Sequence, residues 1–174
     1  MENSRLLVDT IGSFTTNYLG ERMKVSVISG YFQAAFFGLD IHQGYIDYFT
    51  SAAEGADLLI IVIQNITQQY KKYGVLAKPL HSIIQNIVEW CKLNLACKVV
   101  VMINHQDNIA ESLRYIASRY EEVQFCKDGD RDFDSLPKEE KDVLNECKNI
   151  EFKFLGNAKK ASSSEILSNA STDL

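Results

Sequence analysis

Four stretches of the sequence carry side chains that commonly bind or transfer phosphate. The first is Gly30-Tyr31-Phe32, followed by His42-Gln43-Gly44-Tyr45. A helix that begins near Gln43 would point free N–H groups and the positive end of its dipole at a bound anion. His42 could then donate a hydrogen bond to a phosphoryl oxygen as charge builds in a transition state, or it could serve only as a helix cap.

The second and third stretches also combine charge with glycine. Lys71 and Lys72 precede Tyr73-Gly74, and a lysine on such a loop can bring a point charge to a polyphosphate, although paired lysines also simply aid solubility. Lys127-Asp128-Gly129-Asp130-Arg131-Asp132 could bind a base, a sugar or a phosphate, or could form only an acidic turn. It is too short for an EF-hand calcium loop and lacks the terminal glutamate.

The fourth stretch is Ser162-Ser163-Ser164, which follows two lysines and precedes Glu165. Three hydroxyls at the start of a helix could bind phosphate, although Ser162 and Glu165 alone also fit a capping box. No metal site is expected, because the cysteines form no C-x-x-C pair and none lies at metal-ligand spacing from a histidine. We interpret Cys91, Cys97, Cys126 and Cys147 as reduced thiols.

The elements that must position these residues alternate between strands and helices. Apolar or β-branched runs predict strands over 24–29, 56–64, 98–104, 122–125 and 150–155, and residues 31–41 are apolar but irregular. Helices are expected over 43–54, from Pro79 to about 95, from a cap at Asp107 to about 120, and over 137–148. Residues 65–78 are predicted to form a loop, and Ser162 to begin a last short helix.

This alternation predicts an α/β fold: a doubly wound, mostly parallel five-stranded sheet with helices on both faces. Ligands of such sheets bind beyond the carboxyl ends of the strands, which is where the four stretches fall. We expect an amphipathic N-terminal extension over 1–23, one domain over 24–167 and a flexible tail over 168–174.

The composition favours a small-molecule partner. The 174 residues carry a net charge of −5, which argues against nucleic acid or an anionic membrane as the main partner. No run approaches the ~18 apolar residues that a membrane span needs, and the first residues lack the apolar segment of a secretory signal. A cytoplasmic protein is therefore predicted.

The order of the four stretches resembles that of the cytidylyltransferase-like nucleotidyltransferases, such as the glycerol-3-phosphate cytidylyltransferases and the adenylyltransferase domains of ADP-heptose synthesis. Gly30-Tyr31-Phe32-Gln33 is similar to the family's Gly-x-Phe-Asp turn, and HQGYIDYF, residues 42–49, to its "HxGHIxYF" helix. Lys72 and Gly74 resemble its loop lysine and glycine. Residues 128–131 resemble its "GGDR" or "KGxDY" turn, and residues 162–164 its closing serine or threonine run.

The resemblance spans residues 24–167 and implies a Rossmann-like nucleotidyltransferase fold. It also implies a reaction in which a phosphorylated sugar or polyol attacks the α-phosphorus of CTP or ATP and releases pyrophosphate, with Mg²⁺ accompanying the triphosphate. His42 would stabilise the α-phosphoryl charge, Lys72 would hold phosphates, and Ser162–Ser164 would receive the leaving group. Members of the family are often dimers.

Some positions depart from the family pattern. Tyr45 stands where the second motif histidine is expected, Gln33 replaces the turn aspartate, and about six extra residues separate Phe32 from His42. One hypothesis is an active enzyme that uses Tyr45 or His81 instead. The other is an inactive descendant that binds nucleotide or serves in assembly, with residues 32–39 and the extension as interaction surfaces. An α/β domain unrelated to nucleotides is the third alternative.

Overall fold

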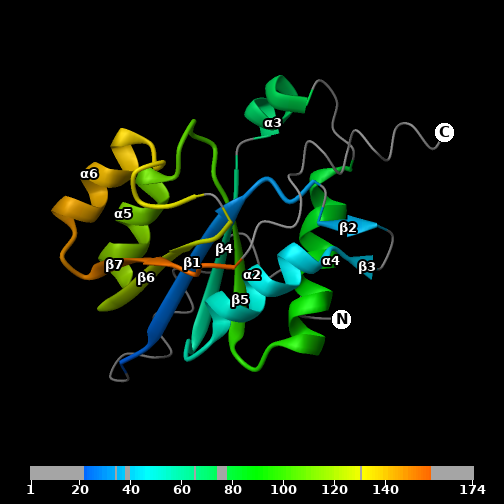
Figure 1. Cartoon of the computed structure of the whole chain (residues 1–174), viewed down its shortest axis with the longest axis horizontal. Helices are drawn as coiled ribbons and strands as arrows, with labels where there is room; N and C mark the ends of the chain where they lie inside the picture. Colours follow the sequence, from blue (N-terminus) through cyan, green and yellow to red (C-terminus); the bar gives the residue numbers. More distant parts are fainter. Residues whose placement is uncertain are drawn as a thin grey trace.

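Five parallel strands form the central sheet of the protein. The computed structural model describes residues 22–33, 35–37, 40–64, 66–73, 78–129 and 131–157. The strands lie in the order β5-β4-β1-β6-β7 (Figure 1). Their bounds are Lys24–Gly30 for β1, Leu58–Ile63 for β4, Lys98–Ile103 for β5, Glu122–Lys127 for β6 and Ile150–Phe154 for β7. The predicted doubly wound α/β sheet is confirmed, and each expected strand is present.

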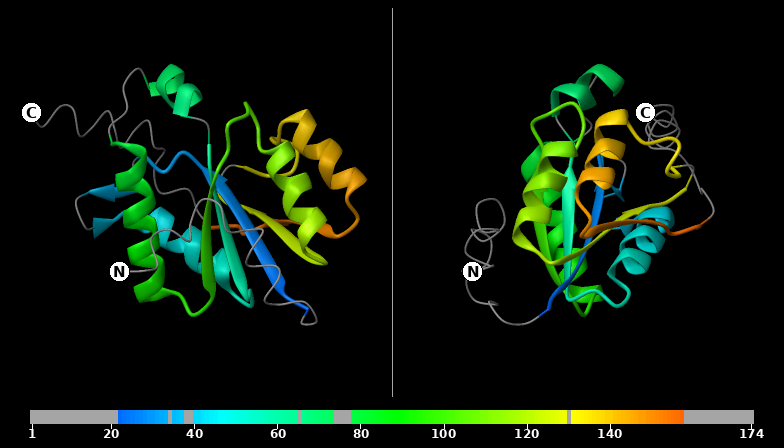
Figure 2. Two further views of the ribbon diagram at one scale, coloured as in Figure 1. Left: turned by 180° about the vertical axis from the view of Figure 1, so that it is seen from behind. Right: turned by 90° about the vertical axis from the view of Figure 1, so that its left-hand side faces the viewer.

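Helices cover both faces of the sheet, as predicted. One face carries α2 (Gln43–Ala53) and α4 (Leu80–Asn94), and the other carries α5 (Ala110–Arg119) and α6 (Lys138–Glu146). In Figure 1 the first pair lies to one side of the strands and the second pair to the other. A further helix, α3 (Ile66–Tyr73), lies beyond the end of β4, as both views in Figure 2 show.

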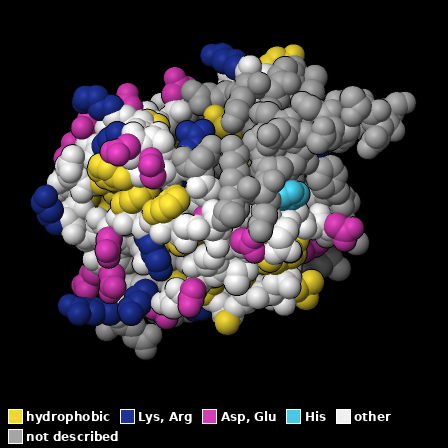
Figure 3. All heavy atoms as spheres, in the orientation of Figure 1, with side chains coloured by type: hydrophobic (Ala, Val, Ile, Leu, Met, Phe, Trp, Pro, Cys, Tyr) yellow, Lys and Arg dark blue, Asp and Glu magenta, His cyan; other side chains and the backbone are white. Residues whose placement is uncertain are grey.

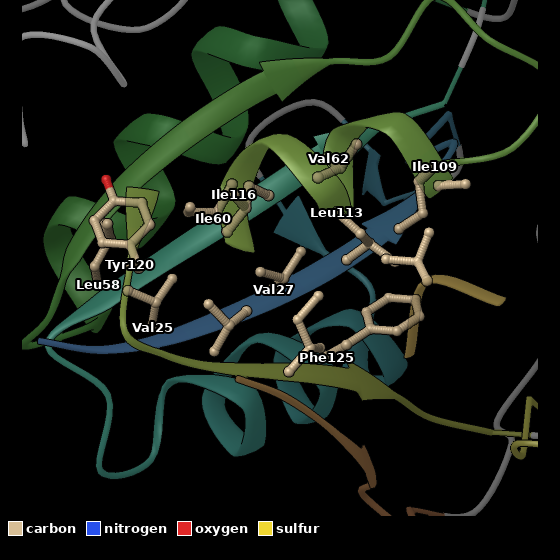
Figure 4. Packing of buried hydrophobic residues seen from close by; sticks show 14 of the residues in the cluster. Val25, Val27, Leu58, Ile60, Val62, Ile109, Leu113, Ile116, Tyr120 and Phe125 are labelled. Carbon is tan, nitrogen blue, oxygen red and sulfur yellow. The ribbon is translucent and has the colours of Figure 1, made fainter. Parts of the chain in front are cut away.

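The interior strand β4, which lies between β5 and β1, is apolar along its whole length. All six of its residues are buried, because helices cover it on both sides. Leu58, Ile60 and Val62 point into the cluster beneath α5 and α6 (Figure 4), whereas the alternate residues pack against α2 and α4. Each such aliphatic side chain stabilises the fold by about 1.5–3 kcal/mol on burial.

The stretch between β1 and α2 has more structure than its irregular sequence pattern indicated. Phe36–Phe37 (β2) and Asp40–Ile41 (β3) form a small antiparallel pair. Ala35 and Phe36 are buried in the cluster beneath α2 and α4. The interpretation of residues 32–39 as an interaction surface is therefore wrong for Phe32, Ala35 and Phe36, whose apolar surface is already covered.

Two local predictions are also wrong. Residues 66–73 of the expected loop form the helix α3, and Asp107 does not cap α5. The residue at the cap position is Ile109, and the Asn108 side-chain oxygen accepts a hydrogen bond from the Ala110 N–H at 3.0 Å. The neighbouring Asn108 thus does what was expected of Asp107.

Several predictions concern residues that the structure does not describe. They include residues 1–21 of the extension, Ser162–Ser164 with the helix expected there, and the tail over 168–174. Within the described part of the chain, every helix is too short or too polar to span a lipid bilayer.

Candidate functional site

The site lies where the strand order reverses, between β1 and β6. The connections from β1 through β4 to β5 place their helices on one face, and those from β5 through β6 to β7 place theirs on the other. The ends of β1 and β6 therefore diverge to opposite faces and leave a place for a ligand beyond them. Gly30 and Lys127 are the last residues of these two strands.

The first helix after β1 begins at this edge with a histidine cap. The Nδ1 atom of His42 accepts a hydrogen bond from the Gly44 N–H at 3.1 Å, and the His42 N–H donates to the Ala35 carbonyl at 2.8 Å. Because Nδ1 acts as an acceptor, the proton of the neutral imidazole lies on Nε2. The capping role and the phosphate-binding role are therefore compatible, since Nε2 keeps an N–H for a ligand.

Tyr45 packs with neighbouring rings, one turn into α2. Its ring centroid lies 5.8 Å from that of Phe32 and 6.2 Å from that of Phe49, and the ring meets His42 edge-on at 6.5 Å. These distances are typical of favourable aromatic pairs. Tyr45, which stands where a second histidine was expected, thus packs against the apolar cluster beneath α2.

The turn after β1 is shaped by a close contact. Phe32 has a left-handed backbone conformation with φ +59° and is only 1% exposed. A Cβ atom on residue 30 would lie 3.3 Å from the Phe32 ring, so glycine is the residue that fits there. Phe32, expected to contact nucleotide, instead packs in the core, where it fixes the path of the turn.

Gln33, which stands where the sequence resemblance led us to expect an aspartate, forms hydrogen bonds inside the protein. Its side-chain Nε2 donates to the Gln69 Oε1 at 2.8 Å, and its Oε1 accepts from the Lys78 N–H at 3.0 Å. The Gln69 side chain in turn donates to the Gln64 carbonyl at 2.8 Å. This buried network joins the turn after β1 to α3 and to the start of α4.

Lys127, the first residue of the charged stretch 127–132, is a half-buried cation at the reversal point. Its Nζ donates to the Ser29 Oγ at 2.6 Å and thereby links the ends of β6 and β1. Burial lowers the pKa of Lys127 to about 8, while the Glu140 carboxylate acts in the opposite direction. The sequence prediction ended the strand at 125 and placed Lys127 in the following loop, whereas β6 extends to Lys127.

Tyr48 holds α2 against the two strands. Its hydroxyl donates to the Cys126 carbonyl at 3.0 Å and lies 3.4 Å from the Ser29 carbonyl oxygen. Burial raises the pKa of Tyr48, so the phenol stays protonated and keeps its hydrogen to donate. The helix that carries His42 is thus fixed relative to the end of β1.

The loop after β6 combines a structural aspartate with an exposed arginine. The Asp128 carboxylate accepts hydrogen bonds from the Gly129 N–H at 2.8 Å and from the Asn157 side chain at 2.7 Å. Arg131 is exposed and close enough to Tyr31 to lower the pKa of that phenol, against the larger effect of burial, which raises it. Arg131 and Tyr31 therefore lie near each other across the reversal point.

The predicted site residues fall into three sets: those near the reversal point, one on α3, and those outside the described residues. Those near the reversal point are Gly30, Tyr31, Phe32, His42, Gly44, Tyr45, Gly129 and Arg131. Lys72 lies on α3, beyond the end of the neighbouring strand β4. Asp130 and Ser162–Ser164 lie outside the described residues.

Comparisons with known proteins indicate the fold. No protein-family model and no curated protein matches the sequence. The structure is similar to the lipopolysaccharide core biosynthesis protein from Thermoplasma volcanium, with a TM-score of 0.53 and 15% identity over 80% of this chain and 99% of that chain.

It is also similar to the pantoate-beta-alanine ligase from Francisella tularensis, whose structure was determined as a complex with beta-gamma ATP and beta-alanine. The TM-score is 0.56 and the identity 13%, over 97% of this chain and 73% of that chain. At these identities the comparisons define the class of fold. This chain has the same Rossmann-like α/β architecture as these two proteins.

Proposed function

We propose that the protein is a nucleotidyltransferase that joins a nucleoside monophosphate from CTP or ATP to a phosphorylated sugar or polyol and releases pyrophosphate. Two separate observations at the carboxyl edge of the sheet support the proposal: the His42-capped start of α2, which follows β1, and the Lys127–Ser29 pair, which links the ends of β6 and β1. A helix N-terminus, an imidazole N–H donor and an ammonium group each favour an anion.

The proposed reaction is an in-line displacement at phosphorus. An oxygen of the acceptor phosphate forms a bond to the α-phosphorus, the bond from that phosphorus to the bridging oxygen breaks, and pyrophosphate leaves with the electron pair. The protein contributes orientation and charge stabilisation. His42 Nε2–H would donate to a non-bridging α-phosphoryl oxygen, and the Lys127 ammonium would offset the charge that develops there.

Other residues would complete the site. Lys72 would hold the outer phosphates, Ser162–Ser164 would receive the leaving pyrophosphate, and Tyr45 would donate a hydrogen bond from its phenol. The turn Gly30-Tyr31-Phe32, with Gly44, would shape the phosphate pocket, and residues 129–131 would contact the nucleoside. The crystal structure of the ligase with a similar fold holds beta-gamma ATP, which supports a nucleotide as a ligand of this fold.

Mg²⁺ would accompany the triphosphate. Within the described residues, no three His, Cys, Asp or Glu side chains gather to hold a metal ion. Mg²⁺ is commonly held by substrate phosphates and water with one or two carboxylates, so this chemistry needs no larger protein cage. When bound, the ion would supply positive charge to the phosphates, while His42 and Lys127 act from the protein.

A second function is favoured by Tyr45 and Gln33. Tyr45 cannot supply the charge of an imidazolium, and Gln33 is engaged by Gln69 and Lys78. A protein that retains the phosphate pocket but lacks these groups would bind nucleotide without turnover and act as a regulatory or assembly module. We therefore test the two functions together.

The test is release of pyrophosphate from CTP or ATP with a panel of phosphorylated sugars and polyols, in MgCl₂ and again in EDTA. Turnover with one nucleotide and one acceptor class, abolished by EDTA, is the expected result. Clear nucleotide binding by calorimetry without turnover on any acceptor would establish the binding module instead. Absence of both binding and turnover would refute both functions.

Two substitutions of His42 separate its chemistry from its capping role. His42→Ser keeps a capping oxygen, so we expect stability to change by less than about 0.5 kcal/mol, whereas His42→Ala should lose about 0.5–2 kcal/mol. Both should lose turnover by about 10²–10³-fold, because neither can reach the phosphoryl oxygen. Thermal unfolding and initial rates measure the two effects, and an active His42→Ser protein would remove His42 from the mechanism.

A further inference from the structure

The outer edge of the sheet at β7 has no partner strand within the described residues, where β7 pairs with β6 alone. The Asn149 carbonyl accepts from Val123 N–H and the Leu155 N–H donates to Lys127, so the odd-numbered residues of this stretch direct their backbone groups toward β6. In a parallel ladder, the N–H and C=O of Phe152 and Phe154 then point away from the sheet. These groups are available to another strand.

Side chains on this edge alternate between charge and apolar surface. Glu151 and Lys153 are exposed on one face of β7. Phe152 lies on the other face, where its ring centroid is 5.6 Å from that of Phe133. Phe133 is 40% exposed and Phe154 is 46% exposed. Figure 3 shows hydrophobic side chains with acidic and basic groups around them on the side of the molecule that carries β7 and α6.

We propose that two copies of the chain associate by antiparallel pairing of their β7 strands about a two-fold axis at Phe152. In this register Phe152 faces the partner's Phe152, and each exchanges its N–H and C=O with the other. Glu151 then faces the partner's Lys153, and Ile150 faces the partner's Phe154. The outward backbone groups are paired, and two oppositely charged pairs form. This association is independent of the proposed catalytic function.

The order of charges on β7 specifies both the partner and the register. A slip by two residues would place either Lys153 opposite the partner's Lys153 or Glu151 opposite the partner's Glu151, which is unfavourable in each case. A slip by one residue would turn the backbone groups of one strand away from the other. A lysine on an edge strand usually discourages pairing, but here a glutamate of the second copy faces it.

The structural consequence is one continuous sheet shared by two copies. Because the pairing is antiparallel, the carboxyl ends of the strands point in opposite directions in the two copies, and the two candidate sites open to opposite sides. The pairing involves five residues from each chain, a small contact for a protein dimer. We therefore expect a dimer that dissociates on dilution.

The test is sedimentation velocity of the full chain over a dilution series, with charge-reversed variants. Wild type should change from dimer to monomer as it is diluted. Glu151→Lys and Lys153→Glu each create two like-charged pairs and should weaken the dimer by about tenfold or more. An equal mixture of the two variants restores opposite charges and should form a heterodimer. Lys92→Glu, at an exposed position of α4, should leave the mass distribution unchanged.

Circular dichroism of each variant verifies that it is folded. A wild-type protein that is monomeric at the highest concentration would overturn the proposal. So would single variants that dimerise as well as wild type, because another surface would then hold the copies together. If one single variant unfolds, the double variant Glu151→Lys/Lys153→Glu still tests the proposal. This double variant should form a homodimer like wild type, but it should not form a heterodimer with the wild-type chain.

Discussion

Lys127 is half-buried, and among the described residues the hydroxyl of Ser29 is the hydrogen-bond acceptor of its ammonium group. Its ammonium has three hydrogens, of which Ser29 Oγ takes one at 2.6 Å, and the aromatic ring of Phe125 lies 5.4 Å away. An ammonium held in this way is only partly compensated, which is why its pKa falls to about 8. An anion bound at the reversal point would supply the missing interaction and favour the charged form.

This coupling predicts that triphosphate binding takes up a proton. At pH ~8.5, a lysine with a pKa of about 8 is largely neutral in the free protein, and a bound anion raises that pKa so that a proton is acquired. Calorimetry in buffers of different ionisation enthalpy measures the uptake. In Lys127→Arg the guanidinium is always charged, so the uptake should disappear. Equal uptake in both proteins would assign the proton to another group.

At the scale of elements, the predictable features are those whose cause is local in the sequence. β4 is a continuous apolar run because both faces are covered, and α4 follows Pro79 because proline suits a helix start. The elements that escaped prediction depend on distant contacts. Gln33 reaches Gln69 on α3 across 36 positions, and the hairpin of β2 and β3 packs its apolar residues beneath α2.

The features of the candidate site likewise divide into those that a local sequence pattern predicts and those that depend on distant contacts. The HQGY stretch was found because a helix start has a local signature, and its place at the end of β1 followed from the parallel fold. The contact between Lys127 and Ser29 was not found, because it joins strands 98 positions apart and depends on where β6 ends. The internal use of Asp128 and Gln33 also depends on partners that no local pattern reveals.

Mutation at the start of α5 tests which residue caps this helix. The Asn108 side chain accepts from the Ala110 N–H, whereas Asp107 is exposed and makes no such bond among the described residues. Asn108→Ala should therefore lower the free energy of unfolding by about 1 kcal/mol. Asp107→Ala should change it by less than about 0.5 kcal/mol. Urea unfolding of both variants measures the difference, and the reverse order would restore Asp107 as the cap.

At the scale of the whole molecule, the sheet separates stability from the site. Two apolar clusters lie on its two faces, and the candidate site uses polar groups at the carboxyl edge of the strands. Stability depends mainly on the apolar area that both clusters bury, and the chemistry depends on a few polar groups at that edge. Substitution of polar groups at this edge can therefore change the proposed activity while the fold persists.

This separation predicts opposite effects for core and site substitutions. Ile61→Ala removes a fully buried side chain from the centre of the sheet and should lower the free energy of unfolding by about 2–5 kcal/mol. Leu93, which is 85% exposed on α4, is the matched control. Leu93→Ala should change the free energy of unfolding by less than about 0.5 kcal/mol.

Below its unfolding temperature, Ile61→Ala should bind nucleotide with an affinity within about twofold of wild type, because a relaxed cavity at the centre of β4 leaves the polar groups at the edge in place. His42→Ser should show the converse, with near-normal stability and lost turnover. Thermal melts and calorimetry on the same preparations measure both quantities. A contradictory result would be a loss of nucleotide affinity in Ile61→Ala that parallels its loss of stability. The carboxyl edge of the sheet and the core would then form one cooperative unit, and the site could not change independently of the fold.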